Sequence, residues 1–176
     1  MNLLKITMLV VVSPRIGWDE MNRSSVKTSD ILSKAFFPML IFLALTAFAP
    51  LIYDANLTFV SAIISSIFHF SAYFLSYYLV SYLLGGFYPE LVKTKAGKGR
   101  VNDFILFNLI YLMFLSIIEN LLPIDFTPGL FMMLYVIWLV NVGAPYLGIK
   151  EEKKNKFVFI ASAMLLVAPI FLHLIH

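Results

Sequence analysis

Residues 104–122 read FILFNLIYLMFLSIIENLL, a stretch in which Glu119 is the single charged residue. An α-helix needs about 20 mainly apolar residues to cross the roughly 30 Å hydrocarbon core of a bilayer. This stretch has that length and that composition. It therefore predicts a helix that crosses a membrane.

Four further apolar runs flank this stretch and contain no Asp, Glu, Lys or Arg, and Asp54 lies at the turn between the first two. They cover residues 35–53, 57–84, 126–148 and 157–175. In lipid each segment must satisfy its own backbone polar groups, which favours helices. Strands of a membrane barrel would show alternating segments of about ten residues instead. We therefore predict an all-α bundle with five transmembrane helices over residues 35–176, preceded by an N-terminal segment, residues 1–34.

The composition agrees with lipid as the main solvent. Of the 176 residues, 61% are hydrophobic and 13% are charged, and the mean hydropathy is +0.89. A soluble domain carries about 45–50% apolar and about 25% charged residues. The net charge of +3 does not indicate nucleic-acid binding, because the basic residues form short clusters between apolar runs. The absence of cysteine excludes disulfides, thiol catalysis and thiolate zinc sites.

The basic residues also predict the orientation of the chain, because loops on the cytoplasmic side carry an excess of Lys and Arg. All thirteen lie in the N-terminal segment, the second loop or the fourth loop. They are Lys5, Arg15, Arg23, Lys27, Lys34, Lys93, Lys95, Lys98, Arg100, Lys150, Lys153, Lys154 and Lys156. Five spans place these three stretches on one side, whereas four or six spans would not. We expect the N-terminus in the cytoplasm and the C-terminus outside.

The N-terminal segment contains a second, shorter apolar run, Leu3–Val12. Ten residues are too few to span a bilayer, and no small-residue cleavage site follows them, so we expect this run to lie in the cytoplasmic interface. Trp18 is a candidate interfacial anchor. Thr28-Ser29-Asp30 is predicted to cap the helix that enters the first span, and Pro38 to kink that helix or mark the start of the span.

Several motifs occur in an order that resembles a known family. They are Ser13-Pro14 with Trp18, Pro38, Leu121-Leu122-Pro123, and the segment from Tyr135 through Asn141–Gly148 to Glu151-Glu152-Lys153-Lys154. Together they resemble the Yip family, five-span membrane proteins first named for interacting with Ypt/Rab GTPases. The long cytosolic N-terminal region of the eukaryotic members is missing, so the sequence is similar to the short prokaryotic form. The resemblance implies five spans and a bacterial cytoplasmic (inner) membrane, and it does not extend to Rab binding.

Polar residues inside predicted spans are candidates for a functional site. Glu119 lies one turn before Pro123 and is either a carboxylate at the water boundary or part of a proton or cation site. His69, Tyr73 and Tyr77 share one helical face. They form either interhelical hydrogen bonds or a proton relay.

Asn141, Gly143 and Pro145 interrupt the inner half of the fourth span, and Asn108 lies at a matching depth in the third. Pro145 has no N–H and leaves the carbonyl of Asn141 without its helical partner. This pattern predicts either a kink packed against neighbouring helices or a polar cavity open to the cytoplasm.

These observations favour a non-enzymatic membrane protein that organises the membrane or recruits partners. The basic loops would contact anionic headgroups at about 1 kcal/mol per charge. The alternative is a small permease or lipid-transfer protein with a cavity lined by Asn108, Asn141, His69 or Glu119. No metal-binding helix motif, nucleophile elbow or phosphate loop indicates an enzyme. We predict no cofactor and no metal, and the sequence identifies no protein partner.

Overall fold

The computed structural model describes residues 3–24, 26–87, 95–122 and 127–175. Every regular element in these ranges is helical. In chain order they are α1 Leu3–Val12, α2 Pro14–Arg23, α3 Thr28–Ile31, the π-helix η1 Leu32–Phe36, α4 Phe37–Thr46, the 3₁₀-helix η2 Ala49–Ile52, α5 Phe59–Tyr82, the π-helix η3 Leu83–Phe87, α6 Lys95–Leu121, α7 Thr127–Gly143, the 3₁₀-helix η4 Ala144–Leu147 and α8 Glu151–Ile175.

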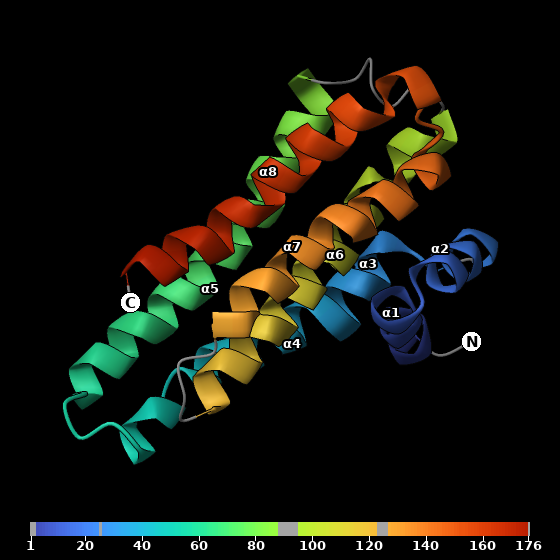
Figure 1. The fold of residues 1–176 in the computed structure, drawn as a ribbon. Helices are drawn as coiled ribbons and strands as arrows, with labels where there is room; N and C mark the ends of the chain where they lie inside the picture. Colours follow the sequence, from blue (N-terminus) through green and yellow to red (C-terminus); the bar gives the residue numbers. More distant parts are fainter. Residues whose placement is uncertain (1–2, 25, 88–94, 123–126, 176) are drawn as a thin grey trace.

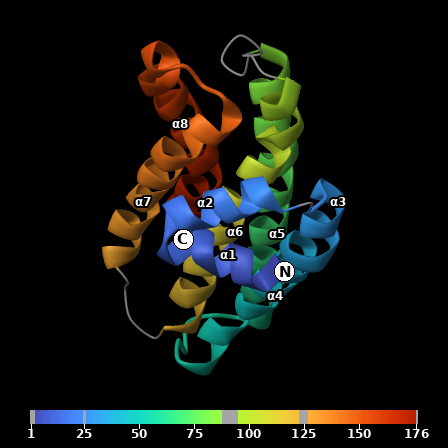
Figure 2. The same ribbon diagram turned by 90° about the vertical axis from the view of Figure 1, so that its right-hand side faces the viewer.

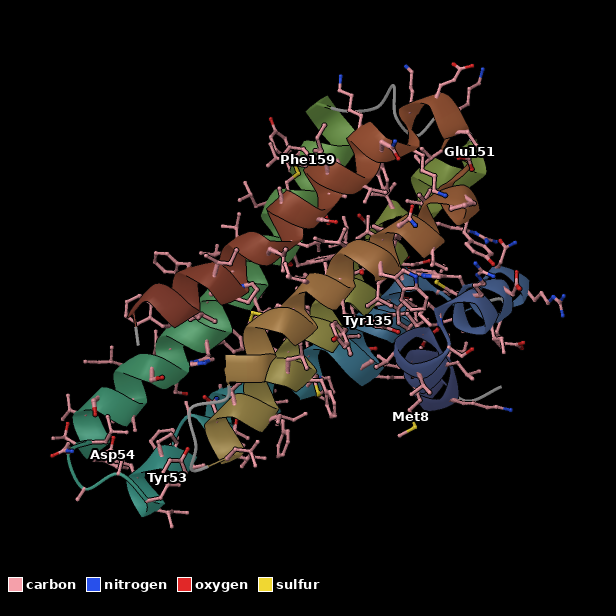
Figure 3. All side chains as sticks on the ribbon, viewed as in Figure 1. Met8, Tyr53, Asp54, Tyr135, Glu151 and Phe159 are labelled. Atoms are coloured by element: carbon pink, nitrogen blue, oxygen red, sulfur yellow. The ribbon has the colours of Figure 1, made fainter. Side chains whose placement is uncertain are left out.

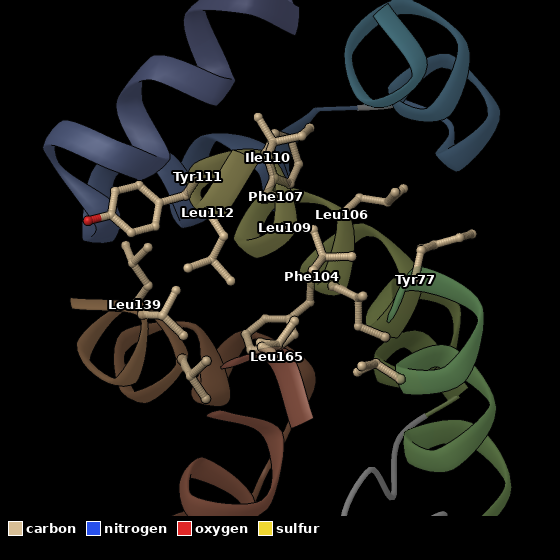
Figure 4. Packing of buried hydrophobic residues seen from close by; sticks show 14 of the residues in the cluster. Tyr77, Phe104, Leu106, Phe107, Leu109, Ile110, Tyr111, Leu112, Leu139 and Leu165 are labelled. Carbon is tan, nitrogen blue, oxygen red and sulfur yellow. The ribbon is translucent and has the colours of Figure 1, made fainter. Parts of the chain in front are cut away.

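The long helices form a bundle in which α4, α5, α6, α7 and α8 alternate in direction (Figure 1). The central member is α6, because 83% of its most apolar window is buried inside the protein, against 28%, 22% and 39% for the α4, α5 and α8 segments. Figure 4 shows Phe104, Leu109 and Leu112 of α6 in the core with Leu139 of α7 and Leu165 of α8. The surrounding helices therefore present wide apolar surfaces outward, which suits a lipid solvent.

Four helical segments are long and apolar enough to cross a membrane, namely Thr28–Ile52, Phe59–Gly86, Arg100–Leu121 and Glu151–Leu172. A shorter apolar helix, Met133–Leu147, lies where the fourth span was predicted. The predicted all-α membrane bundle is confirmed. The described residues support four full-length spanning helices, so the count of five is not shown by length alone.

The helix that leads into the first spanning segment begins at Thr28, in the region where its start was predicted, and continues through η1, so residue 34 lies inside a continuous helical stretch. In this π-turn the N–H of Phe37 bonds to the carbonyl of Leu32, and Pro38 follows in the first turn of α4. A missing N–H is tolerated in a first turn. Pro38 therefore marks where α4 begins within a helical stretch that continues from α3.

The predicted cap of this helix is wrong. Lys27 is the N-cap residue of α3, and no side chain caps the helix there. The Thr28 hydroxyl instead donates a 2.6 Å hydrogen bond to Oδ1 of Asp103 on α6. Because the carboxylate of Asp103 is buried, a partner for it stabilises the fold more than a cap at an exposed helix end.

The N-terminal apolar run forms a helical hairpin with the segment that follows it. Figure 2 shows α1 and α2 lying across the face of α6. The two helices pack closely at Gly17, where a Cβ atom would lie 2.4 Å from the backbone nitrogen of Val10. The hairpin buries Ile6 and Val10 of α1 and Met21 of α2 in the common core. The run is therefore a packed part of the bundle.

Candidate functional site

The candidate residues fall into two groups, which we name inner and outer after the orientation predicted from the basic residues. The inner group surrounds Trp18 of α2. Its indole is fully buried and stacks on Phe104 and Tyr146, with ring centroids 5.3 and 6.4 Å apart. Phe107 meets the same ring edge-on at 6.2 Å. A side chain with this burial does not reach lipid headgroups. The predicted role of Trp18 as an interfacial anchor is corrected to that of a packing residue that joins the hairpin to α6 and η4.

Gly143, the last residue of α7, makes room for this indole. A Cβ atom at Gly143 would lie 2.7 Å from Phe104 and 2.9 Å from Trp18. Real Cβ contacts are essentially never shorter than 3.0 Å. The glycine in the predicted helix break is therefore required by close packing on two aromatic rings.

The polar residues near this break differ in burial and in hydrogen bonding. Asn108 is fully buried, and its Nδ2 donates to the carbonyl of Phe104 one turn back in α6. Its Oδ1 and the indole Nε1 of Trp18 have no hydrogen-bond partner among the described residues. Asn141 is half-buried and Pro145 is exposed in η4, after which Gly148 ends the turn at φ 71°. This geometry is a packed helix end.

Polar contacts hold the hairpin against the inner ends of the other helices. The Tyr146 hydroxyl donates to Oδ1 of Asp19 over 2.8 Å. Arg100 of α6 donates to the carbonyl of Asn22 over 3.2 Å, and the hydroxyl of Tyr135 in α7 donates to the carbonyl of Val11 over 3.1 Å. Three separate elements thus bind the backbone or side chains of α1 and α2.

The outer group lies between α5 and α6. Tyr73 and Ser116 are buried, and their hydroxyl oxygens are 2.8 Å apart. This is the interhelical hydrogen bond expected on the face shared by His69, Tyr73 and Tyr77, and all three of those residues are buried. His69 makes a 2.8 Å bond from Nδ1 to the carbonyl of Ser65 within α5.

Glu119 is half-buried on α6, three residues after Ser116. We call His69, Tyr73, Ser116 and Glu119 the outer polar cluster. Beside it, the side chain of Asn120 donates to Thr46 of α4 over 3.2 Å.

The carbonyl of Asn120 accepts a 2.8 Å bond from Tyr53, which follows η2. Partial burial and the Asp54 carboxylate raise the pKa of the Tyr53 phenol, so it stays a neutral donor at physiological pH. Figure 3 shows Tyr53 and Asp54 at the end of the bundle opposite Glu151.

The two groups are far apart along the bundle. The Tyr73–Ser116 contact sets the register of the antiparallel α5 and α6, and His69 lies one turn further out. Asn108 lies eight residues inward from Ser116, so it is about 18 Å from the level of His69 at roughly 1.5 Å per residue. The structure therefore does not bring Asn108 and Asn141 into one cavity with His69 and Glu119.

Sequence reasoning missed Ser116, although it lies three residues before Glu119 and so on the same side of the helix. It also missed Phe104 and Gly17, which look ordinary in an apolar run and in a short helix. Among the described residues, no three His, Asp or Glu side chains gather where they could hold a metal ion.

Comparison with known proteins identifies no relative. No family model matches the chain, and neither a curated protein nor a solved structure matches it.

Proposed function

We propose that this chain is a non-enzymatic, five-span integral membrane protein of the Yip type. Its N-terminus lies in the cytoplasm, its C-terminus outside, and it organises the membrane or recruits partners at its cytoplasmic face. The observation that carries the proposal is the packed α1–α2 hairpin, which presents the exposed side chains of Arg15 and Arg23 on the predicted cytoplasmic side. A bacterial cytoplasmic membrane is the proposed location.

The dimensions of α7 support the fifth span. Its 17 residues rise about 26 Å at roughly 1.5 Å per residue, and the four residues of η4 add about 8 Å at roughly 2.0 Å each. The sum of about 33 Å matches a hydrocarbon core of about 30 Å. In this topology the cytoplasmic side carries thirteen basic and seven acidic residues, and the outer side carries three acidic residues and no basic one.

The hairpin surface combines cations with exposed apolar side chains. Met8, Val12 and Ile16 are 62%, 81% and 55% exposed, and Arg15 and Arg23 are exposed on the same hairpin. Apolar side chains flanked by Lys and Arg favour the boundary between headgroups and acyl chains. Each cation near an anionic leaflet contributes about 1 kcal/mol. The hairpin is therefore suited to gather anionic lipids around the cytoplasmic end.

The test uses purified protein in liposomes of phosphatidylcholine and phosphatidylglycerol. A donor dye is attached to the cysteine of Asn22→Cys, because the chain has no other cysteine. Energy transfer from this dye is then measured to lipids that carry an acceptor dye, one headgroup type at a time. We expect enrichment of phosphatidylglycerol, and less of it in an Arg15→Gln, Arg23→Gln double variant. A dye on Asn56→Cys, at the opposite end, is the control. If neither lipid is enriched, and vesicle shape in electron micrographs matches protein-free vesicles, the lipid-organising proposal fails.

A small permease or lipid-transfer protein is the second candidate function, and the outer polar cluster favours it. Polar and ionisable side chains within spans often mark a path for protons or ions. Flux into liposomes that contain wild-type protein or Glu119→Gln tests this candidate. It fails if wild-type flux does not exceed that of protein-free liposomes.

A further inference from the structure

The face of α1 that does not pack on the bundle is apolar and uncovered. Met8 and Val12 lie one turn apart on this face, and both are exposed. Ile16, near the start of α2, is exposed as well. Lys5 is the single charged residue of α1. An exposed apolar surface of this kind marks contact with lipid or with another protein.

A hydrogen bond fixes the level of the C-terminal end of α1 in the bundle. The hydroxyl of Tyr135 donates to the carbonyl of Val11 over 3.1 Å, and Tyr135 is the middle residue of α7. The rings of Tyr135 and Tyr111 of α6 also make contact, with centroids 5.5 Å apart. Tyr111 is in turn at the middle of the spanning segment Arg100–Leu121. Two helices thus place Val11 near mid-depth of the spans.

The rest of α1 lies across the bundle at a similar level. Figure 2 shows α1 running from the side of α4 to the side of α7, with the N-terminus of the chain at the α4 end. There it contacts η1. Phe36, at the end of η1, is eight residues after Thr28, whose hydroxyl bonds to Asp103. Because α4 and α6 run in the same direction, Phe36 is about 12 Å outward from Asp103 and level with Tyr111.

The α2 helix leads from this level back to the cytoplasmic end. Trp18 stacks on Phe104, and Arg100 donates to the carbonyl of Asn22. Along α6, Phe104 and Arg100 lie about 10 and 16 Å inward from Tyr111. All of these contacts of the hairpin therefore lie between the middle of the spans and their cytoplasmic end.

The surface beside α1 indicates which occupant covers it. Leu134, Ile137 and Trp138 of α7 are each at least 40% exposed, as a helix that faces hydrocarbon requires. The ring of Trp138 lies against Tyr135, the residue that holds Val11, with centroids 4.9 Å apart. The apolar face of α1 is thus continuous with the lipid-facing side of α7, which points to acyl chains.

We propose that the α1–α2 hairpin is a wedge in the cytoplasmic leaflet and that the protein favours membrane in which this leaflet is convex. A ten-residue helix is about 15 Å long and about 10 Å across, so α1 displaces about 150 Å² of lipid from one leaflet. Unequal displacement expands that leaflet relative to the other, and helices inserted in one leaflet are sensitive to curvature. The flexible stem of Lys5 lets its ammonium reach toward the headgroups.

The first experiment measures the depth of α1 in liposomes. A fluorescent dye on Val12→Cys, at an 81% exposed site of a chain without other cysteines, is quenched by lipids that carry a nitroxide on the acyl chain or on the headgroup. We expect the acyl-chain nitroxide to quench this dye at least about twofold more strongly than the headgroup nitroxide, and the order to reverse for Asn22→Cys on α2. Stronger quenching of the Val12→Cys dye by the headgroup nitroxide overturns the proposal. Protection from both nitroxides means that protein covers α1 and overturns it too.

The second experiment measures curvature preference in thin tubes drawn from giant vesicles. A dye on Asn155→Cys and an impermeant quencher distinguish the two orientations of the protein. Copies with the cytoplasmic side outward should be denser in the tube than in the flat membrane, and copies with that side inward should be less dense. This comparison of one protein with itself needs no destabilising variant. Equal density for both orientations overturns the wedge.

The wedge deepens the proposed organisation of the membrane and rests on the proposed five-span topology. It does not rest on the enrichment of anionic lipid. Loss of phosphatidylglycerol enrichment with curvature sorting intact rejects the gathering of anionic lipid and supports the wedge. Enrichment without sorting rejects the wedge alone.

Discussion

Gly17 provides a direct test of how the N-terminal hairpin is packed. At an exposed position inside a helix, replacing glycine by alanine stabilises the helix by about 1 kcal/mol. Gly17 is buried, and an added Cβ would lie 2.4 Å from the nitrogen and 2.5 Å from the Cα of Val10, and 2.6 Å from the carbonyl carbon of Leu9. All three are backbone atoms, so rotation of a side chain does not relieve the contact.

The size of the effect follows from these distances. Ordinary van der Waals contact begins near 3.4 Å, so α1 and α2 must separate by about 1 Å in Gly17→Ala. Overpacking of this kind costs about 1–3 kcal/mol, and a contact with backbone lies at the upper end of that range. After subtracting the gain in helix propensity, we expect a net loss of about 1–2 kcal/mol.

The assay uses tryptophan fluorescence. The chain has two tryptophans, so a Trp138→Phe background leaves Trp18 as the single emitter. Because Trp18 is fully buried, its emission starts at short wavelength and resists quenching by acrylamide. Gly17→Ala should shift the emission to longer wavelength, increase quenching and lower the thermal unfolding midpoint in detergent. Ile16→Ala, at a 55% exposed neighbour, is the control. A Gly17→Ala protein as stable as its parent, or more stable, would refute the close helix contact.

Three further predictions concern the rest of the bundle. Gly143→Ala should destabilise the protein by about 1–3 kcal/mol, because its Cβ would meet Phe104 at 2.7 Å; thermal unfolding measures this, and an unchanged midpoint contradicts it. Tyr73→Phe removes the hydroxyl that contacts Ser116 and should lower the free energy of unfolding by about 0.6 kcal/mol, a typical value for such hydrogen bonds in membranes. Refolding in detergent measures this loss. The control, Tyr78→Phe at a 53% exposed site, should leave the free energy of unfolding unchanged. In intact cells, an impermeant thiol reagent should label Asn56→Cys and should label Asn155→Cys only after permeabilisation. Labelling of Asn155→Cys in intact cells would mean that α7 does not cross.

Much of the architecture was predictable because membrane insertion acts on each segment separately. The apolar run at residues 104–122 corresponds to most of α6, and the run Leu3–Val12 corresponds to α1 residue for residue. The helix start at Thr28 was also predicted, whereas the π-helix η1 and the continuation of the helix through Pro38 in the first turn of α4 were not. The candidate site was only partly predictable. The buried face of His69, Tyr73 and Tyr77 follows from helical spacing, whereas Ser116 as its partner depends on which face α6 turns toward α5.

The sequence by itself determined the solvent, the helical class and the segregation of basic residues, because hydropathy and charge are properties of each segment alone. Only the tertiary structure decided that Trp18 is buried rather than anchored at the interface, since its environment comes from Phe104 and Tyr146, far away along the chain. It also decided that Asn108 lies apart from His69. The depth of a residue within its own helix can be estimated from the sequence. Which side of one helix faces another helix depends on the packing of all the helices in the bundle.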